Sequence, residues 1–258
     1  MFGINQNQIV LFLLVFARVS AALAVFPIFG SNSIPLYTKI GAGLFLSFLI
    51  MPVVASTTLP QHLATAVIIF NVGKEVIVGL LMGFIATLLF AGVEIAGTFA
   101  GMQMGFGIVN VIDPQTQRQV SIIGQFQILM VSMIFLIIDG HHFLLSGLYQ
   151  SFEAIPPVAA RFRSVIFDIN MKMAANIFVA AVKIGAPVIV ALLLTSFVLG
   201  LVARAVPQMN VFIVGLPLKI GLGLMALAFS LPFVARLFEE MFIQFRVDFS
   251  TLIRAMSP

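Results

Sequence analysis

The sequence predicts an all-α integral membrane protein, and composition and patterning both support that prediction. Hydrophobic residues make up 61% of the 258 residues and charged residues only 9%, whereas charged residues make up about 25% of a typical soluble domain. Long runs carry no charged residue, namely residues 19–38, 40–73, 76–93, 119–138 and 184–203. Because about 20 apolar residues cross the hydrocarbon of a bilayer as a helix, several membrane helices are expected. The runs follow one another too closely to leave a globular domain between them.

The first three helices can be placed from apolar runs and their polar ends. Residues 8–29 form the first, which ends in "FPIFGSNSIP", and it should be retained because it lacks the basic flank and cleavage site of a signal peptide. The second covers residues 39–55 and stops at the proline-bearing stretch "MPVVASTTLPQH". The third runs over residues 64–101. It is too long for one perpendicular crossing, so it should tilt, bend or break near residues 92–97.

The second half of the chain predicts one more helix and then a hairpin. A helix is expected over residues 120–135. The segment "EAIPPVAARFRSVIFDINMK", residues 153–172, is the most polar of the chain and indicates an exposed amphipathic connection. Two helices, residues 173–205 and 211–245, then form a hairpin with its turn at "VPQMN". Pro207 and Pro217 bracket that turn and predict an early break in the second helix.

Small residues recur at four-residue intervals, which predicts close helix packing. One series is Gly79, Gly83, Thr87 and Ala91, and a second is Gly97, Gly101 and Gly105. Four residues is slightly more than one helical turn, so each series forms a stripe that lets another backbone approach closely. Ordinary packing between helices is a sufficient explanation for both stripes.

Ionisable residues inside apolar runs are the usual functional candidates in a membrane protein. Each costs about 2.5 to 3.5 kcal/mol at the bilayer centre, so it needs a partner, a wet cavity or a place near the interface. Lys74 and Glu75 are adjacent and point about 100° apart on a helix, so they should pair with other segments or subunits. For Lys39, Arg204 and Lys219, a position at a helix end, with the side chain extended to water, explains the charge as well as a functional role does. The intramembrane candidates are Arg18, Lys74, Glu75, Glu94, Asp139 and Lys183.

Signals for catalysis, metals or nucleic acid are weak. Asp139, His141 and His142 are near neighbours, but adjacent helical positions diverge, whereas metal ligands on a helix are usually three or four residues apart. "NVGKEV" lacks the other residues of a phosphate-binding loop. The thirteen basic residues are dispersed rather than gathered in a stripe, and no cysteine is present. We therefore predict a non-enzymatic protein with no catalytic residues, no metal and no cofactor.

The stretch "GMQMGFGIVNVIDPQTQRQVSIIGQFQ", residues 101–127, interrupts the apolar chain far from either end. Gly105 and Gly107 allow backbone angles closed to other residues, and the proline after Asp113 disfavours helix there. Irregular backbone at membrane depth persists only where protein or water satisfies it. A loop inside a wet lumen and an ordinary solvent loop both fit this pattern. The candidate residues are Gly105, Gly107, Asn110, Asp113, Pro114, Gln115, Gln117 and Arg118.

Three stretches together resemble a known family. "ARAVPQMNVFIVGLPLKIGLGL", residues 203–224, "NVIDPQTQ" and "PIFGSNSIPLYTKIGAGLFLS" are similar to the FliR family of the type III secretion export gate. The similarity covers essentially the whole chain. "VGLPLK" favours the flagellar branch, because the virulence-type relatives differ after the shared Pro-Gln-x-Asn-Val-Phe core.

The resemblance implies a fold, partners and a location. It implies helical hairpins with kinked or broken helices, one copy of which assembles with FliP and FliQ into a superhelical channel for unfolded flagellar proteins. The assembly would lie in the bacterial inner membrane within the flagellar basal body. Residues 1–171 would be FliP-like and residues 172–258 would be a FliQ-like hairpin. Residues 105–118 would help to close the lumen.

The resemblance also implies that the hairpin turn lies near the cytoplasmic side, where FlhB is expected to bind, with FlhA a further candidate partner. The turn and contact residues would be Pro207, Gln208, Asn210, Phe212, Pro217 and Lys219. Counting positive charges over six crossings instead favours cytoplasmic chain termini. We prefer the resemblance, because helices packed inside an assembly need not follow rules for lipid-exposed spans.

Two other functions fit the same residues. A secondary transporter would use Lys74, Glu75, Glu94 and Asp139 as an ion relay around a midplane site, and broken helices would suit it. A purely structural membrane scaffold would need no lumenal loop. A transporter should bind its substrate as a monomer or homodimer, whereas a gate subunit should be unstable without its partners.

Overall fold

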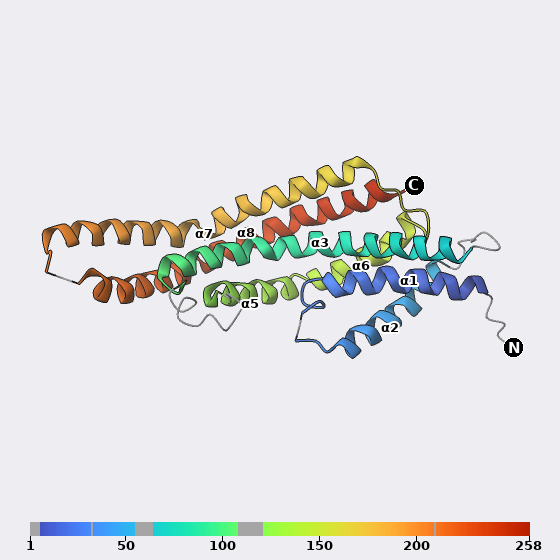
Figure 1. The fold of residues 1–258 in the computed structure, drawn as a ribbon, viewed down its shortest axis with the longest axis horizontal. Helices are drawn as coiled ribbons and strands as arrows, with labels where there is room; N and C mark the ends of the chain where they lie inside the picture. The colour runs from blue at the N-terminus through green and yellow to red at the C-terminus, as the bar shows by residue number, and fades with distance from the viewer. Residues whose placement is uncertain (1–5, 32, 55–63, 108–120, 209) are drawn as a thin grey trace. The chain divides into compact units, whose positions relative to one another are not determined.

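The computed structural model describes residues 6–31, 33–54, 64–107, 121–208 and 210–258, and across these ranges the chain is helical without a β-strand (Figure 1). Among the described residues, five helices are long and apolar enough to cross a membrane, or six spans if α5 and α6 count as one broken span. The predicted class, an all-α integral membrane protein, is confirmed. The helices are α1 (Gln6–Val25), α2 (Leu36–Val54), α3 (Thr65–Met104), α5 (Ile122–Ile137), α6 (Gly140–Ala154), α7 (Ser164–Ala205) and α8 (Val211–Met256).

The first two helices end close to the predicted positions. α1 ends at Val25, four residues before the predicted end, because the chain turns at Phe26 and Ile28 adopts a left-handed φ of 71°. The Gly30 amide then donates to the Phe26 carbonyl oxygen at 2.7 Å and completes the turn. α2 begins directly after Pro35, three residues before the predicted start, and ends at Val54, with Pro52 inside its last turn.

The third helix is continuous, so of the three predicted alternatives near residues 92–97, a tilt, a bend or a break, the break does not occur. α3 runs unbroken for 40 residues, about 60 Å at 1.5 Å per residue. Its glycines allow close packing instead of interrupting the helix. A Cβ at Gly97 would lie 2.5 Å from the Gly124 Cα of α5, and a Cβ at Gly92 would lie 3.5 Å from the Ala180 Cβ of α7.

The predicted polar connection over residues 153–172 is too long. α6 continues to Ala154 and α7 already begins at Ser164, so residues 155–163 form the connection. The missed turns, residues 164–172, extend a hydrophobic face of α7: Ile166 is buried like Met173 and Ile177 after it, while Asp168 and Lys172 are exposed. That spacing fits an amphipathic helix. α8 is also longer than predicted and ends at Met256.

The chain divides into two compact units. Unit 1 comprises Met1–Leu88, Ile138–Ala174 and Ile243–Pro258, and unit 2 comprises Leu89–Ile137 and Ala175–Phe242. The long helices α3, α7 and α8 each contribute residues to both units. The predicted FliP-like and FliQ-like parts, residues 1–171 and 172–258, are defined by resemblance to partner subunits and not by compactness. That division stays a prediction.

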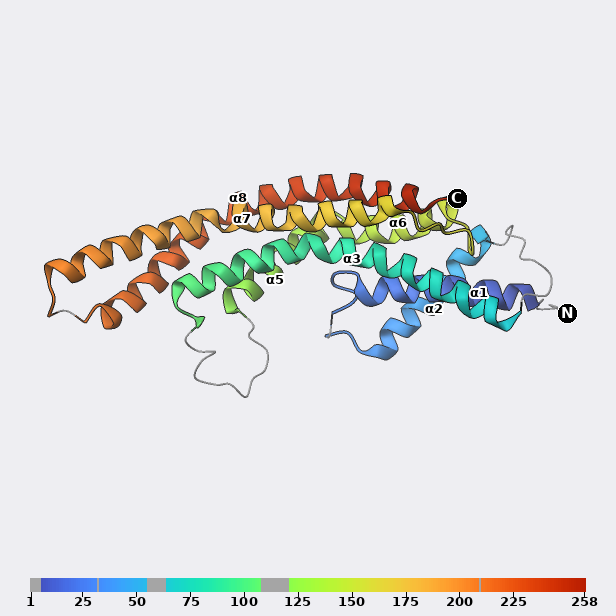
Figure 2. The ribbon, with the colours of Figure 1, turned by 45° about the horizontal axis from the view of Figure 1, so that its top comes forward.

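Each unit has its own apolar core. In unit 1, Leu14, Val19, Met82, Leu144 and Leu148 are fully or almost fully buried. In unit 2, α7 and α8 run side by side as a hairpin joined by residues 206–210 (Figures 1 and 2). A cluster of α3, α5, α7 and α8 residues fills the space beside the hairpin, namely Ala100, Met104, Ile123, Val188, Leu192 and Leu227.

Aromatic rings extend the core of unit 2 along α3, α5 and α8. The Phe90 ring meets the Phe135 ring edge-on at 5.3 Å between centroids and the Phe238 ring at 5.7 Å. Phe135 meets Phe242 at 5.7 Å in the same way. Edge-on pairs stabilise the contact by about 0.5 to 1.5 kcal/mol beyond simple burial. The rings therefore hold these helices in a defined register.

Candidate functional site

A buried ion pair joins α1 to α3 in unit 1. The side chains of Arg18 and Glu75 are both 0% exposed, and Arg18 Nε donates to Glu75 Oε2 at 2.6 Å. Arg18 Nη2 lies 2.6 Å from the same oxygen. Both groups were expected to need partners from other segments, and each supplies the other's counter-charge.

Helix α6 completes the surroundings of the Arg18 guanidinium. Arg18 Nη1 donates to the Ser151 carbonyl oxygen at 3.0 Å and lies 3.3 Å from the Ser151 Oγ. The guanidinium carbon stands 4.1 Å from the centre of the Phe152 ring, a cation–π contact. One arginine thus connects α1, α3 and α6. Sequence reasoning did not identify Ser151 or Phe152, because no local pattern links them to a residue 133 positions earlier.

The neighbouring residues Lys74 and Glu75 hold the two peptide groups on either side of Val158, in the connection between α6 and α7. Glu75 Oε1 accepts a hydrogen bond from the Val158 amide at 3.0 Å, and Lys74 Nζ donates to the Val158 carbonyl oxygen at 2.9 Å. Val158 has a φ of 75°, a conformation that is rare for a β-branched residue. The side chains of Lys74 and Glu75 do not pair with each other, as their helical spacing requires, yet both reach the same residue.

The small residues of the first stripe make room for this network. A Cβ added at Gly79 would collide with the Arg18 carbonyl oxygen, and one added at Gly83 would lie 2.6 Å from the Val25 Cβ. Gly79 follows Glu75 by one turn of α3, so its lack of a side chain lets α1 approach where the ion pair forms. The stripe and the charges therefore belong to one packing arrangement.

The other candidate charges do not join this network. Glu94 is exposed on α3 in unit 2, and Lys183 is exposed on α7 in the same unit. Asp139 is exposed at the start of α6. Because both Glu75 oxygens already accept hydrogen bonds from Arg18 and Val158, that carboxylate is poorly placed to bind a transported ion. The transporter hypothesis gains no support from this geometry.

Asp139, His141 and His142 lie closer together than predicted. One potential metal-ligating atom from each lies within 4.8 Å of the others, and the two imidazole centroids are 4.2 Å apart. The expectation that adjacent positions diverge is wrong here, because Asp139 precedes α6 with a left-handed φ of 56° and its Oδ1 lies 3.1 Å from His142 Nδ1. The amino end of a helix disfavours a cation. The absence of a metal stays a prediction.

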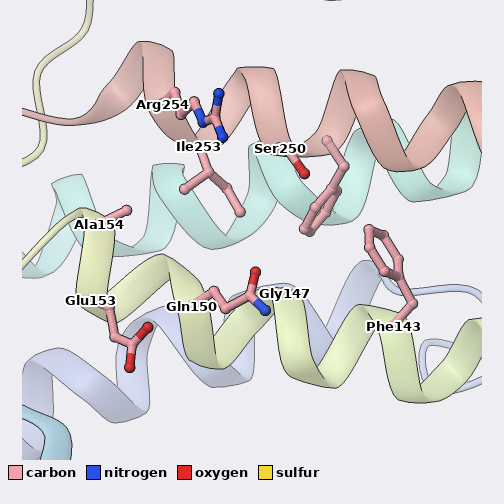
Figure 3. Close-up of a pocket in the computed structure, with 9 residues that line it drawn as sticks. Phe143, Gly147, Gln150, Glu153, Ala154, Ser250, Ile253 and Arg254 are labelled. Atoms are coloured by element: carbon pink, nitrogen blue, oxygen red, sulfur yellow. The ribbon is translucent and has the colours of Figure 1, made fainter.

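A cavity of about 440 Å³ lies between α6 and the last turns of α8 in unit 1 (Figure 3). Gly147 allows the Phe249 ring to pack directly against α6. Gln150 and Glu153 line the cavity from α6, and Ser250 and Arg254 line it from α8. Figure 3 shows the charged ends of Glu153 and Arg254 apart on their different helices. None of these residues was singled out from the sequence.

The polar stretch is described only at its two ends. Gly105 has a φ of +97°, and the Phe106 amide donates to the Gly101 carbonyl oxygen at 3.0 Å, so α3 ends at Met104. Gly107 is half-buried. At the far end, the Ser121 Oγ lies 3.3 Å from the Gly97 carbonyl oxygen. The remaining candidates lie outside the described residues, namely Asn110, Asp113, Pro114, Gln115, Gln117 and Arg118.

The hairpin turn is exposed, and the helix after it is unbroken. Pro207 and Gln208 are exposed, and Asn210 begins α8 by accepting a hydrogen bond from the Ile213 amide at 3.4 Å on its side-chain oxygen. Pro217 lies inside α8, so the predicted break there is wrong. It stands two turns into the helix, where its ring removes one hydrogen bond without ending the helix. Lys219 is half-exposed, and the Phe212 side chain lies outside the described residues.

These features define an integral membrane protein in which a buried ion pair and its hydrogen bonds connect helices. The sequence profile of the family described as bacterial export proteins, family 1, matches residues 9–245. The chain therefore belongs to this family of bacterial export proteins.

Relatives from distant bacteria agree with that membership. The chain is 38% identical over 251 residues to the flagellar biosynthetic protein FliR of Bacillus subtilis, covering 95% of this chain and 92% of that protein. It is 31% identical over 255 residues to the FliR protein of Aquifex aeolicus, covering 97% and 96%. The Escherichia coli FliR protein is 28% identical over 225 residues, covering 87% and 85%. The resemblance to the FliR family is confirmed.

Proposed function

We propose that this protein is a non-enzymatic subunit of the flagellar type III export gate in the bacterial inner membrane. The observation that carries the proposal is the family match over residues 9–245, together with relatives named flagellar biosynthetic proteins that align along almost their whole length. The apolar helices fit a membrane subunit. The buried ion pair fits a part whose polar groups position helices.

The proposed partners follow from the same resemblance. FliP and FliQ assemble with this chain into the channel for unfolded flagellar proteins, residues 1–171 correspond to FliP, and residues 172–258 correspond to FliQ. FlhB binds at the hairpin turn and FlhA lies nearby. The exposed Pro207 and Gln208 support the turn as a contact surface, because their side chains are accessible to a partner.

The proposed lumenal closure rests on residues 105–118. Gly105 follows the last residue of α3, and Ser121 precedes the first residue of α5. The two ends lie close together, since a Cβ at Gly101 would lie 2.6 Å from the Ser121 Oγ. The chain therefore leaves and returns at nearly the same place in unit 2. A segment fixed at both ends in this way can close a lumen without being part of the wall. Its amide side chains tolerate contact with water.

Deletion of residues 109–118 tests the closure. The assembled gate should conduct small ions while the complex stays intact, because the deletion removes the closing segment and spares its anchors at Gly101 and Ser121. Membrane conductance and native mass spectrometry of the complex measure the two parts of this expectation. A Gly/Ser replacement of equal length is the matched control, which separates loss of bulk from loss of sequence. Unchanged conductance in an intact deletion complex would exclude the closing role.

A further inference from the structure

Asp139, His141 and His142 bring three metal-ligating groups together in unit 1. One oxygen or nitrogen atom from each residue lies within 4.8 Å of the others. The Asp139 Oδ1 and the His142 Nδ1 are 3.1 Å apart. Two ligands of one zinc ion, each about 2.0 to 2.1 Å from the metal, are separated by about 2.9 to 3.4 Å. This pair of atoms therefore already has the spacing of neighbouring ligands around a single ion.

The backbone of Asp139 explains why its carboxylate faces a side chain instead of capping the helix. Asp139 precedes α6 with a φ of 56° and a ψ of 28°, and its side chain forms no capping hydrogen bond. A residue at this position usually has extended backbone angles, and its side chain accepts a hydrogen bond from an amide of the first turn. Here the Asp139 carbonyl oxygen accepts from the Phe143 amide at 3.1 Å, while the carboxylate is directed to His142. The carboxylate is therefore available to a cation.

His141 contributes an imidazole with an unsatisfied nitrogen. Its Nδ1 atom is buried and has no hydrogen-bond partner among the described residues. The His141 and His142 rings lie close together, with centroids 4.2 Å apart and a tilt of 34° between the ring planes. A buried polar atom without a partner costs free energy, and coordination to a metal ion would satisfy this nitrogen. The unsatisfied atom thus points to a ligand independently of the spacing of the three residues.

Aromatic packing fixes the first turn of α6, on which both histidines lie. The Phe143 ring contacts the Phe245 and Phe249 rings of α8, at 5.8 Å and 5.5 Å between centroids. The side chains of His142 and Asp139 are 71% and 72% exposed, so they can rotate to complete the coordination of an ion. The turn that carries the ligands is therefore held in place, and its side chains are accessible from outside the chain.

The types of ligand select the class of ion. Two imidazole nitrogens and one carboxylate oxygen suit zinc, nickel, copper or ferrous iron, whereas magnesium and calcium prefer oxygen ligands alone. The negative charge of Asp139 offsets the partial positive charge at the amino end of α6, which by itself opposes a cation. Three protein ligands leave at least one coordination position for water or for a group from a partner.

We propose that Asp139, His141 and His142 bind one divalent transition-metal ion, which fixes the start of α6. The ion joins the residue before the helix to two residues of its first turn, so it holds the left-handed backbone at Asp139. The proposal replaces the prediction that the chain binds no metal, because that prediction relied on the divergence of adjacent helical positions. It goes beyond the proposed function, since it depends neither on the partner subunits nor on what the assembly exports.

Zinc binding to the full-length protein tests the site. The protein is purified in detergent through a tag without histidines, stripped with a chelator and dialysed against zinc chloride at controlled free concentrations. Wild-type protein should bind about one zinc per chain. H141A, H142A and D139N should each weaken binding at least about tenfold, since loss of even an outer-shell partner typically has an effect of that size. H62A is the matched control and should bind zinc like the wild type, because His62 is the only other histidine of the chain.

Two further measurements separate a specific site from zinc adsorbed at the surface. An excess of magnesium of about a hundredfold should not displace the zinc, because magnesium prefers oxygen ligands. Zinc should raise the melting temperature of the wild type but not that of H142A, whose circular dichroism without zinc should match the wild type. Equal zinc binding by the wild type, H141A and H142A, or displacement by magnesium, would overturn the proposal. Weaker binding in H62A would also overturn it, since the ligands would then include a residue outside the cluster.

Discussion

At the scale of single residues, the Arg18–Glu75 pair is the most consequential feature of unit 1. Two fully buried charges stabilise a fold only when each is paired and hydrogen-bonded, and here Ser151 and Val158 complete the pairing. The sequence marked both charges as needing partners. It could not show which partners, because Arg18 and Glu75 are 57 positions apart.

Removing one charge of this pair should be more harmful than removing both. Arg18→Met or Glu75→Gln alone should destabilise the protein by about 3 to 5 kcal/mol, since each leaves a buried group uncompensated. The double variant Arg18→Met, Glu75→Gln should be less destabilised than either single variant, which requires a coupling free energy of at least about 3 kcal/mol between the two positions. Unfolding of the detergent-solubilised protein by chemical denaturant measures these differences.

The exposed Lys183 provides the control for this cycle. Lys183→Gln removes one charge from an apolar helix without touching the buried network, so it should change stability by no more than about 0.5 kcal/mol in detergent. Additive effects of the two network variants would show that Arg18 and Glu75 are not energetically coupled.

At the scale of the elements, the turn between α7 and α8 contains some residues that are exposed for contact with a partner and another that stabilises the start of α8. Pro207 and Gln208 are exposed and lie outside the helical hydrogen bonding, whereas Asn210 caps α8 through the Ile213 amide. The tip of the turn can contact a partner while its last residue supports the hairpin.

Substitutions at the tip should weaken assembly more than folding. Pro207→Ala with Gln208→Ala should lower the amount of partner protein that co-purifies, while the thermal stability of the chain stays within about 0.5 kcal/mol. Asn210→Ala is the contrasting variant, since loss of a helix cap costs about 0.5 to 2 kcal/mol of stability. Co-purification and circular dichroism melting distinguish the two effects. A tip variant that melts early but still assembles would refute this assignment.

The predicted helices agree with the structure where the apolar pattern is long. They differ where the prediction depended on glycine or proline, because both residues occur at helix breaks and inside continuous helices. A break near residues 92–97 was one of three predicted alternatives, but Gly92 and Gly97 are packing positions in a continuous helix. Pro217 was also interpreted as a break, yet α8 passes through it. A glycine or proline shows what the backbone permits, and neighbouring helices decide which permitted conformation is stable.

At the scale of the whole molecule, apolar surface exceeds what one chain can bury. Large side chains are exposed on helices of both units, among them Phe48 on α2 and Phe229 on α8. We expect the membrane and the proposed partner subunits to cover this surface.

Co-production with its partners should stabilise the chain in cells. Made alone, it should be degraded several times faster than when FliP and FliQ are made with it, because exposed apolar faces attract chaperones and proteases. Pulse-chase labelling measures the lifetime, and native mass spectrometry of the purified material identifies the assembly. Equal lifetimes, with a monomer or homodimer that binds a small substrate, would favour a transporter instead.

The sequence by itself determined the membrane class, the approximate helices, the family resemblance and the residues whose charge requires explanation. These properties are local, since apolarity, periodicity and turn residues act within a few positions of each other. Only the tertiary structure decided that Arg18, Glu75, Ser151 and Val158 meet, and that Asp139 and the two histidines converge. Such meetings depend on which helices approach closely, and although the spacing of Gly79 predicts a close approach, no local pattern specifies that the approaching helix is α1.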